Sequence, residues 1–176
     1  NMLTESRKIS SEIKSAIGII IKCHKNGNKV IIFGNGGSAA DSQHMAAEFI
    51  GRYMLERKSL PAIALTTDTS IITALGNDYG FENTFSRQCE SMVTKGDVVI
   101  AISTSGNSKN VVNGIKTAKR LGAVVIGLTG QNGDALREIV DVLLVVASKS
   151  TPRIQEGHRI IIHMICEIVE KEFFSQ

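Results

Sequence analysis

Residues 29–41 decide the fold class, and they read Lys-Val-Ile-Ile-Phe-Gly-Asn-Gly-Gly-Ser-Ala-Ala-Asp. The short apolar run Lys29–Phe33 is typical of a strand buried in a parallel sheet. A glycine-rich turn follows it, and a segment of helical composition begins near Ser38. A turn of this kind lets backbone N–H groups approach a bound molecule closely. The stretch therefore predicts one strand–loop–helix unit of an α/β fold.

The same alternation continues towards the C-terminus. We expect further buried strands at Pro61–Leu65, Asp97–Ser103, Ala123–Leu128 and Val142–Val146. Helical segments alternate with them, near Ser38–Tyr53, Asn83–Val93, Lys109–Leu121 and Gly133–Ile139. Two long helical patterns bracket the chain, at Thr4–Lys25 and Arg153–Phe174, and Thr151-Pro152 is a good entry to the second.

This order of elements predicts a three-layer αβα sandwich, in which helices cover both faces of a five-stranded parallel sheet. No internal repeat, linker or low-complexity segment interrupts the pattern, so we expect a single domain over residues 1–176. Asn1 precedes Met2, and we interpret it as a remnant of an expression tag.

The composition argues against several classes of protein. Apolar residues make up 43% of the chain and charged residues 21%, which is ordinary for a globular domain. The net charge is only +3, the basic residues are scattered and Trp is absent, so we expect no nucleic-acid partner. No apolar run approaches the length of a membrane span, and the N-terminus lacks the pattern of a secretory signal. Cys23, Cys89 and Cys166 lack metal-binding spacing, and we expect buried thiols in a reducing cytoplasm.

Two loops that follow strands are candidates for ligand binding. Gly34–Ser38 is neither a complete dinucleotide fingerprint nor a P-loop, and it is as consistent with a tight structural turn as with a ligand loop. The second loop, residues 103–108, reads Ser-Thr-Ser-Gly-Asn-Ser and carries four hydroxyls before a helix. Hydroxyls, free backbone N–H groups and the positive end of a helix dipole suit a phosphate. In the alternative, Ser108 is only an N-cap, which accounts for one of those hydroxyls.

Three side chains are candidates for acid–base chemistry or metal binding. His44 and Glu48 share one helix face, which suits a divalent metal or proton transfer as well as an ordinary exposed surface. His163 lies in an apolar stretch, where a buried histidine needs a partner. Gln155 precedes His163 by about 12 Å along a continuous helix. One small site can therefore contain both residues only if the helix starts late or if neighbouring subunits contribute to the site. His24 and His158 lack comparable neighbours, and we expect them at the surface.

Six motifs occur together over nearly the whole chain: Gly34–Ser38, His44–Glu48, Gly51–Tyr53, Gly76–Gly80, Ser103–Ser108 and Arg153–Glu156. They resemble those of the bacterial phosphoheptose isomerases of the sugar isomerase (SIS) family. The resemblance implies a flavodoxin-like fold and conversion of sedoheptulose 7-phosphate to D-glycero-D-manno-heptose 7-phosphate. That reaction opens the synthesis of activated heptose for lipopolysaccharide or capsule. The resemblance also implies a cytoplasmic homotetramer, active sites between subunits and one zinc ion per subunit.

The resemblance further implies roles for particular residues. Glu48 and His163 match the acid–base pair, and the zinc ligands match His44, Glu48, Gln155 and His163. The substrate would contact Asn35, Gly36, Gly37, Ser38, Glu48, Arg52, Asn77, Asp78, Ser103, Thr104, Ser105, Ser108 and Gln155. Thr151-Pro152 departs from the short loop that some members carry before Arg153.

On this reading Glu48 would move a proton between C1 and C2 through an enediolate while His163 protonates oxygen, and the two roles could be exchanged. A non-catalytic SIS protein that associates with the replication initiator is one alternative, and a sugar-phosphate sensor is another. The presence of both Glu48 and His163 favours the enzyme. A nucleotide-binding Rossmann-like protein is disfavoured by the incomplete glycine fingerprint.

Overall fold

The computed structural model describes residues 2–131 and 133–174, so the interpretation of Asn1 falls outside the described residues. The strands are β1 Val30–Gly34, β2 Ala62–Ala64, β3 Val98–Ser103, β4 Val124–Gly130 and β5 Val142–Val146. The helices are α1 Met2–Lys25, α2 Gly37–Ile50, α3 Thr69–Tyr79, α4 Thr84–Met92, α5 Lys109–Arg120, α6 Asp134–Arg137 and α7 Thr151–Phe174, with a 3₁₀ turn at Phe81–Asn83.

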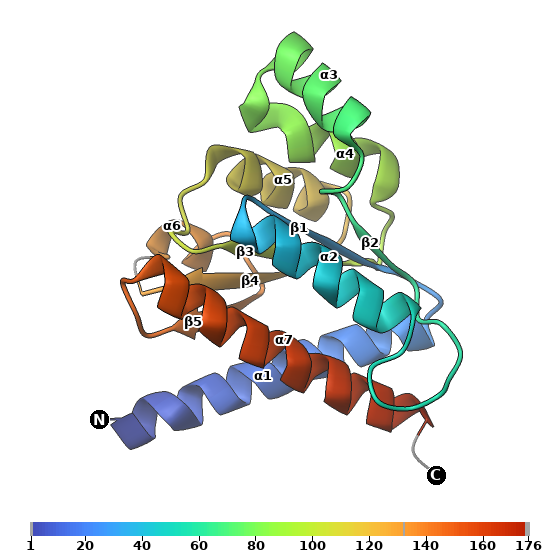
Figure 1. The fold of residues 1–176 in the computed structure, drawn as a ribbon, viewed down its shortest axis with the longest axis vertical. Coiled ribbons are helices and arrows are strands. Elements are labelled where there is room, and N and C mark those ends of the chain that lie inside the picture. Colours follow the sequence, from blue (N-terminus) through green and yellow to red (C-terminus); the bar gives the residue numbers. More distant parts are fainter. Residues whose placement is uncertain (1, 132, 175–176) are drawn as a thin grey trace.

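The strands form one parallel sheet in the order β2-β1-β3-β4-β5 (Figure 1). Alternate residues of each strand face opposite layers of helices. Val30 and Ile32 of β1 pack in the cluster that contains the apolar faces of α1, α2 and α7. Ile31 and Phe33 pack on the other side, in the cluster that contains α4, α5 and α6. The predicted α/β sandwich with long first and last helices is confirmed.

Helix α3 was not expected from the sequence. Asp68 caps it by accepting a hydrogen bond from the backbone N–H of Ile71 at 2.9 Å. None of its residues is fully buried, and Ile71, Ile72 and Leu75 are only half-buried. Residues of low helix propensity, such as Thr69, Thr73 and Gly76, make up much of the segment, so its composition does not indicate a helix. In Figure 1 this helix lies at the opposite end of the molecule from α7.

Because the strands are parallel, the loops that follow them lie at one edge of the sheet, and the loops that precede them lie at the other. Gly34 at the end of β1 is in register with Ile102 near the end of β3, so the loops after the two strands are neighbours at the carboxyl edge. At the opposite edge the buried carboxylate of Asp97 accepts hydrogen bonds from Lys29 Nζ (2.7 Å) and the N–H groups of Lys29 (3.1 Å) and Thr94 (2.8 Å). Burial acts to raise the pKa of Asp97, but these hydrogen bonds bring it below its usual value.

Among the described residues, no helix is both long and apolar enough to cross a membrane.

Candidate functional site

The loop between β1 and α2 brings backbone rather than side chains to the carboxyl edge of the sheet. A Cβ on Gly34 would lie 2.7 Å from the carbonyl oxygen of Ile102, so only glycine fits beside β3. Gly36 has φ of 54°, a left-handed conformation that glycine adopts without strain. Gly36 and Gly37 are exposed, whereas Ser38 is buried, and the carbonyl of Ser38 accepts from Ser42 Oγ at 2.7 Å. Gly36 and Gly37 therefore expose the start of α2, and the hydroxyl of Ser38 does not face solvent.

The loop between β3 and α5 leaves the start of a helix open. Ser108 is the N-cap residue of α5, but its side chain makes no capping hydrogen bond. Instead the Ser108 and Ser103 hydroxyls pair with each other at 3.1 Å. Gly106 turns the chain with φ of 70° and donates its N–H to the carbonyl of Ser103 at 3.0 Å. Thr104 is half-buried and Ser105 is exposed. Ser108 is therefore the N-cap residue by position, but its hydroxyl does not cap the helix, and the arrangement suits an anion.

A pair of amide side chains joins the two loops. Asn35 donates from Nδ2 to Asn110 Oδ1 at 2.8 Å, and Asn110 donates from Nδ2 to Asn35 Oδ1 at 2.9 Å. Asn110 is buried, and its Oδ1 also accepts from the backbone N–H of Val111 at 3.0 Å. Asn110 was not among the site residues predicted from the sequence. Its position in the sequence could have indicated it, because Asn110 is an amide in the first turn of the helix that follows the serine-rich loop.

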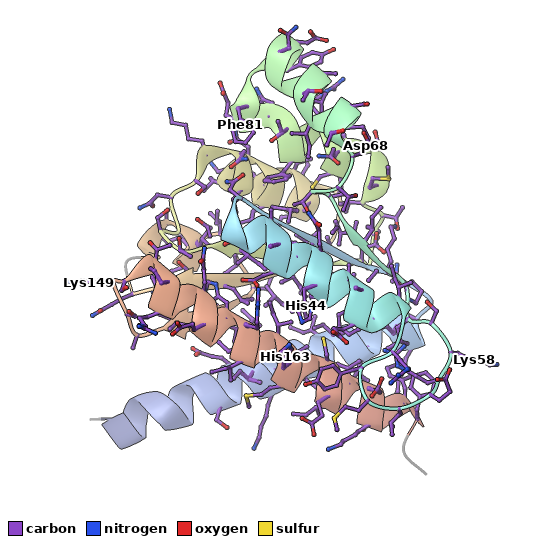
Figure 2. The ribbon with its side chains drawn as sticks, in the orientation of Figure 1. His44, Lys58, Asp68, Phe81, Lys149 and His163 are labelled. Atoms are coloured by element: carbon purple, nitrogen blue, oxygen red, sulfur yellow. The ribbon has the colours of Figure 1, made fainter. Side chains whose placement is uncertain are left out.

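Helices α2 and α7 bring together three of the predicted catalytic and metal-binding side chains, which we call the α2–α7 cluster: His44, Glu48 and His163. The two Nε2 atoms of His44 and His163 are 2.9 Å apart, and Figure 2 shows both residues between these helices. His44 Nε2 lies 3.6 Å from Glu48 Oε1. The ring of Tyr53 packs against that of His163, with centroids 5.7 Å apart. The cluster joins a carboxylate to two imidazoles that are suited to proton transfer.

Gln155 does not join this cluster. It lies two turns before His163 on α7, and its side chain packs on Gly37, where a Cβ would lie 2.7 Å from Gln155 Cδ. The hollow at this place has a volume of about 340 Å³ and is lined by Gly37, Ala40, Asp41, Pro152, Gln155, Glu156 and Arg159. Asp41 is buried there and pairs with Arg159 at 2.7 Å. Within one protomer the four predicted metal ligands are therefore divided between two places.

Three other predicted substrate contacts lie outside both places. Asn77 and Asp78 are exposed near the end of α3, and Asn77 Nδ2 donates to Asp78 Oδ1 at 2.8 Å. Arg52 is exposed in the segment after α2, with its Nε 3.6 Å from Glu56 Oε2. Because α3 projects from the end of the molecule away from α7 (Figure 1), one protomer does not gather all the predicted contacts.

The residues of one protomer fit a zinc ion only in part. His44 and His163 direct imidazole nitrogens at a common point, and an imidazole–imidazole–carboxylate set is a known zinc donor set. Residues 2–131 and 133–174 nevertheless contain no group of three or more His, Cys, Asp or Glu side chains arranged to hold a metal ion.

The expectation that the three cysteines are buried thiols is confirmed, since all three are buried and free. Burial raises the pKa of the Cys23 thiol to about 11 and those of Cys89 and Cys166 to about 12. A thiol with such a pKa stays protonated at neutral pH, which disfavours a role as nucleophile or metal ligand.

The prediction that His24 and His158 lie at the surface is wrong. His158 is fully buried because it follows Ile154 by four residues on the face of α7 that packs on the sheet. Burial lowers its pKa, so the ring is neutral. His24 is half-buried, and its ring packs edge-on against Phe49 and Phe173 with centroids 5.6 and 6.1 Å apart.

Comparison with known proteins assigns the family. Residues 2–130 match the model of the SIS domain. The phosphoheptose isomerase of Geotalea daltonii is 52% identical over 170 residues, which cover 97% of this chain and 88% of that protein.

Two solved structures share the fold over nearly their whole length. The phosphoheptose isomerase of Neisseria gonorrhoeae has a TM-score of 0.84 and 42% identity, covering 97% of this chain and 95% of that one. The phosphoheptose isomerase of Francisella tularensis has a TM-score of 0.89 and 35% identity, covering 96% of this chain and 92% of that one. The chain therefore belongs to the SIS-domain family and, within it, to the phosphoheptose isomerases.

Proposed function

We propose that this chain converts sedoheptulose 7-phosphate to D-glycero-D-manno-heptose 7-phosphate. The observation that carries the proposal is the α2–α7 cluster, in which a carboxylate and two imidazoles meet on facing helices. A ketose–aldose isomerase needs groups that move one proton between two carbons and another between two oxygens. A nucleotide-binding protein or a simple sugar-phosphate sensor has no need of such a group of side chains.

The two loops at the carboxyl edge would bind the distal end of the substrate. Ser103, Thr104, Ser105 and Ser108 offer hydroxyls beside the open N-terminus of α5, where the helix dipole favours a dianionic phosphate. The amide pair of Asn35 and Asn110 holds this loop against Gly36 and Gly37 before any ligand arrives. Binding energy gained at the phosphate then orients the reacting carbons.

Glu48 would take the proton from C1 and return it to C2, and His163 would donate a proton to the oxygen that gains charge. Glu48 supplies the carboxylate of the cluster, which suits a base, and His163 supplies an imidazole that lies against His44 and Tyr53 and suits an acid. Zinc bound by His44 and His163, with Glu48 or Gln155, would act as a Lewis acid on the carbonyl oxygen.

The assay follows aldose formation from sedoheptulose 7-phosphate by wild type and Glu48→Gln. Gln keeps the shape of the side chain and removes the base, so we expect kcat to fall by about 10²- to 10⁴-fold with KM little changed. Wild-type protein that forms no aldose, with or without added zinc, would refute the function. A variant with normal turnover would refute only the role of Glu48. Binding to the replication initiator in a pull-down, without isomerase activity, would favour the non-catalytic alternative.

We also propose that the site is completed by a neighbouring copy of this chain, in a homotetramer. Gln155 and His163 lie about 12 Å apart along α7, too far for one small site within a protomer. The same helix exposes Ile160, Met164 and Ile168 at four-residue intervals, with exposed fractions of 62%, 41% and 42%. An apolar stripe of this kind suits burial against a second copy.

Mixing two inactive variants tests this assembly. If each site combines Gln155 of one copy with His163 of another, Gln155→Ala and His163→Ala will each be inactive and will regain activity when refolded together. Light scattering gives the mass of each assembly. Absence of any recovery in mixed assemblies of confirmed composition would contradict the shared site.

A further inference from the structure

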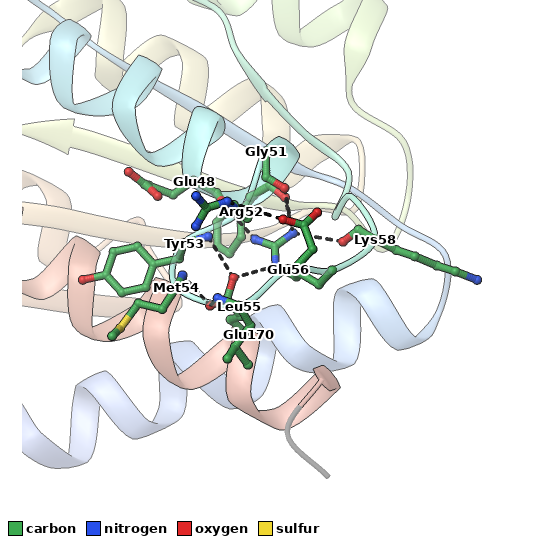
Figure 3. Close-up of polar contacts among 11 residues, drawn as sticks. Glu48, Gly51, Arg52, Tyr53, Met54, Leu55, Glu56, Lys58 and Glu170 are labelled. Carbon is green, nitrogen blue, oxygen red and sulfur yellow. Dashed lines mark hydrogen bonds and ion pairs between the residues drawn. The ribbon is translucent and has the colours of Figure 1, made fainter.

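Glu170 lies near the end of α7 and accepts four hydrogen bonds from the segment that follows α2. The donors are the backbone N–H groups of Tyr53, Met54 and Leu55, at 2.7–2.8 Å, and Nε of Arg57, at 2.7 Å. Figure 3 shows the carboxylate enclosed by this segment. Both partners of the Glu170–Arg57 ion pair are buried, with side-chain exposed fractions of 2% and 1%.

Arg57 continues the connection into α2. The last turn of a helix leaves carbonyl groups without partners inside the helix. Arg57 donates from Nη2 to the carbonyl of Glu48 at 2.6 Å and from Nη1 to that of Phe49 at 2.8 Å. The guanidinium therefore caps the turn of α2 that carries the proposed base, Glu48.

Tyr53 connects the same carboxylate to the other half of the acid–base pair. Its N–H donates to Glu170 Oε1 at 2.8 Å, and its ring packs on that of His163. Moving the backbone at Tyr53 would move the ring that supports His163. Glu170 thus contacts neither proposed catalytic side chain. It is connected to Glu48 through the single residue Arg57 and to His163 through the single residue Tyr53.

We infer that Glu170 is a positioning residue, which sets the geometry of Glu48 through Arg57 and that of His163 through Tyr53. The inference deepens the proposed isomerase function and rests on it. Acid–base groups must be held close to their productive geometry, and a displacement of about 1 Å by a distant substitution can lower the rate by about 100-fold. The loops that would bind phosphate lie beyond the other end of α2, so the main effect is expected on turnover. A change in substrate affinity would come only through Arg52, which lies in the segment that Glu170 holds.

Asp97 provides a matched control. It is also a buried carboxylate, with a side-chain exposed fraction of 1%, and it also accepts several backbone and side-chain hydrogen bonds. It lies at the opposite edge of the sheet from the two loops, and its hydrogen bonds go to Asn28, Lys29 and Thr94, none of which belongs to α2 or α7. Asp97→Asn therefore reports the effect of losing a buried charge that has no connection to Glu48 or His163.

The experiment compares Glu170→Gln with Asp97→Asn by steady-state kinetics, scaled to folded protein, and by crystal structures of both variants. We expect Glu170→Gln to lower kcat by about 10- to 100-fold with KM changed by less than about threefold. In its structure the Tyr53 ring should have left His163, whereas in Asp97→Asn both kcat and this contact should be retained. If Glu170→Gln does not fold, Arg57→Lys is measured in the same way, because Lys keeps the charge but cannot cap both carbonyls.

Two results would overturn the inference. One is that Glu170→Gln loses no more kcat than Asp97→Asn when the two variants lose the same amount of unfolding free energy. The other is a Tyr53–His163 contact and a last turn of α2 that stay unchanged in Glu170→Gln. If wild type does not isomerise sedoheptulose 7-phosphate, the proposed function fails instead, and the crystal structures alone decide whether Glu170 positions these residues.

Discussion

Replacing Glu170 by Gln removes one negative charge from the carboxylate that holds the segment after α2. Burial acts to raise the pKa of Glu170, but the three N–H groups and Arg57 lower it from 4.5 to about 2. One pKa unit corresponds to about 1.4 kcal/mol, so the ionised carboxylate contributes about 3 kcal/mol to the free energy of unfolding at pH 7. We expect Glu170→Gln to lose about that much.

The pH dependence has a definite sign. Because the folded state lowers the pKa, the stabilisation is complete above pH 4.5 and is lost as the pH falls towards about 2. The difference between wild type and Glu170→Gln should therefore shrink to less than about half by pH 3. Other carboxylates titrate in the same range, but they do so in both proteins and cancel in the difference.

Urea unfolding followed by circular dichroism measures both quantities. Protein concentration is held fixed, since assembly adds stability that depends on concentration. A difference below about 1 kcal/mol at pH 7 would refute the reasoning. An equal difference in unfolding free energy at pH 3 and pH 7 would also refute it. Such a result would mean that the variant loses stability through a structural change that does not depend on the ionisation of Glu170.

Three further predictions concern the loops and the metal. Ser108→Ala removes a hydroxyl from the proposed phosphate site and should raise KM by about tenfold or more with kcat retained, whereas the exposed Ser91→Ala should change neither constant. Gly106→Ala adds a Cβ that would overlap Cα of Gly133 and lie 3.0 Å from its carbonyl carbon, at φ of 70°, and it should lower the unfolding free energy by more than about 2 kcal/mol. Gly36→Ala, where no atom lies within 4 Å of the new Cβ, should cost only the backbone strain of about 1–3 kcal/mol and less than Gly106→Ala; equal losses in urea unfolding would contradict the steric argument. Zinc should be present at about one ion per chain by mass spectrometry of the metal and should be lost in His44→Ala, and a variant that retains it would exclude His44 as a ligand.

Much of the fold follows from local patterns in the sequence. The five strands are short apolar runs, and the all-parallel order follows from their alternation with helices. Helix α3 was not predicted because Thr69, Thr73 and Gly76 have low helix propensity, and the helix depends instead on its cap at Asp68. The surface position predicted for His158 is wrong because its spacing from Ile154 puts it on the buried face of α7, and residue polarity alone does not show this.

The site could be predicted only where its residues belong to one motif. His44 and Glu48 are one helical turn apart, so their common face is visible in the sequence. Glu170 and Arg57 are separated by 113 residues, and nothing local marks either as the partner of the other. The amide of Asn110 likewise finds Asn35 across 75 residues. Such contacts depend on how α2, α5 and α7 pack on the sheet, which a single sequence does not specify.

The amide pair between Asn35 and Asn110 also bears on the chemical ageing of the protein. Asn35 precedes Gly36, and an asparagine before glycine deamidates when the glycine nitrogen attacks the side-chain amide carbon. The two hydrogen bonds to Asn110, at 2.8 and 2.9 Å, hold that amide in one orientation and oppose the rotation the attack requires. Deamidation would leave a carboxylate that cannot donate to Asn110 and would put a negative charge beside a loop suited to anions. We therefore expect Asn110 to prolong the working life of the protein.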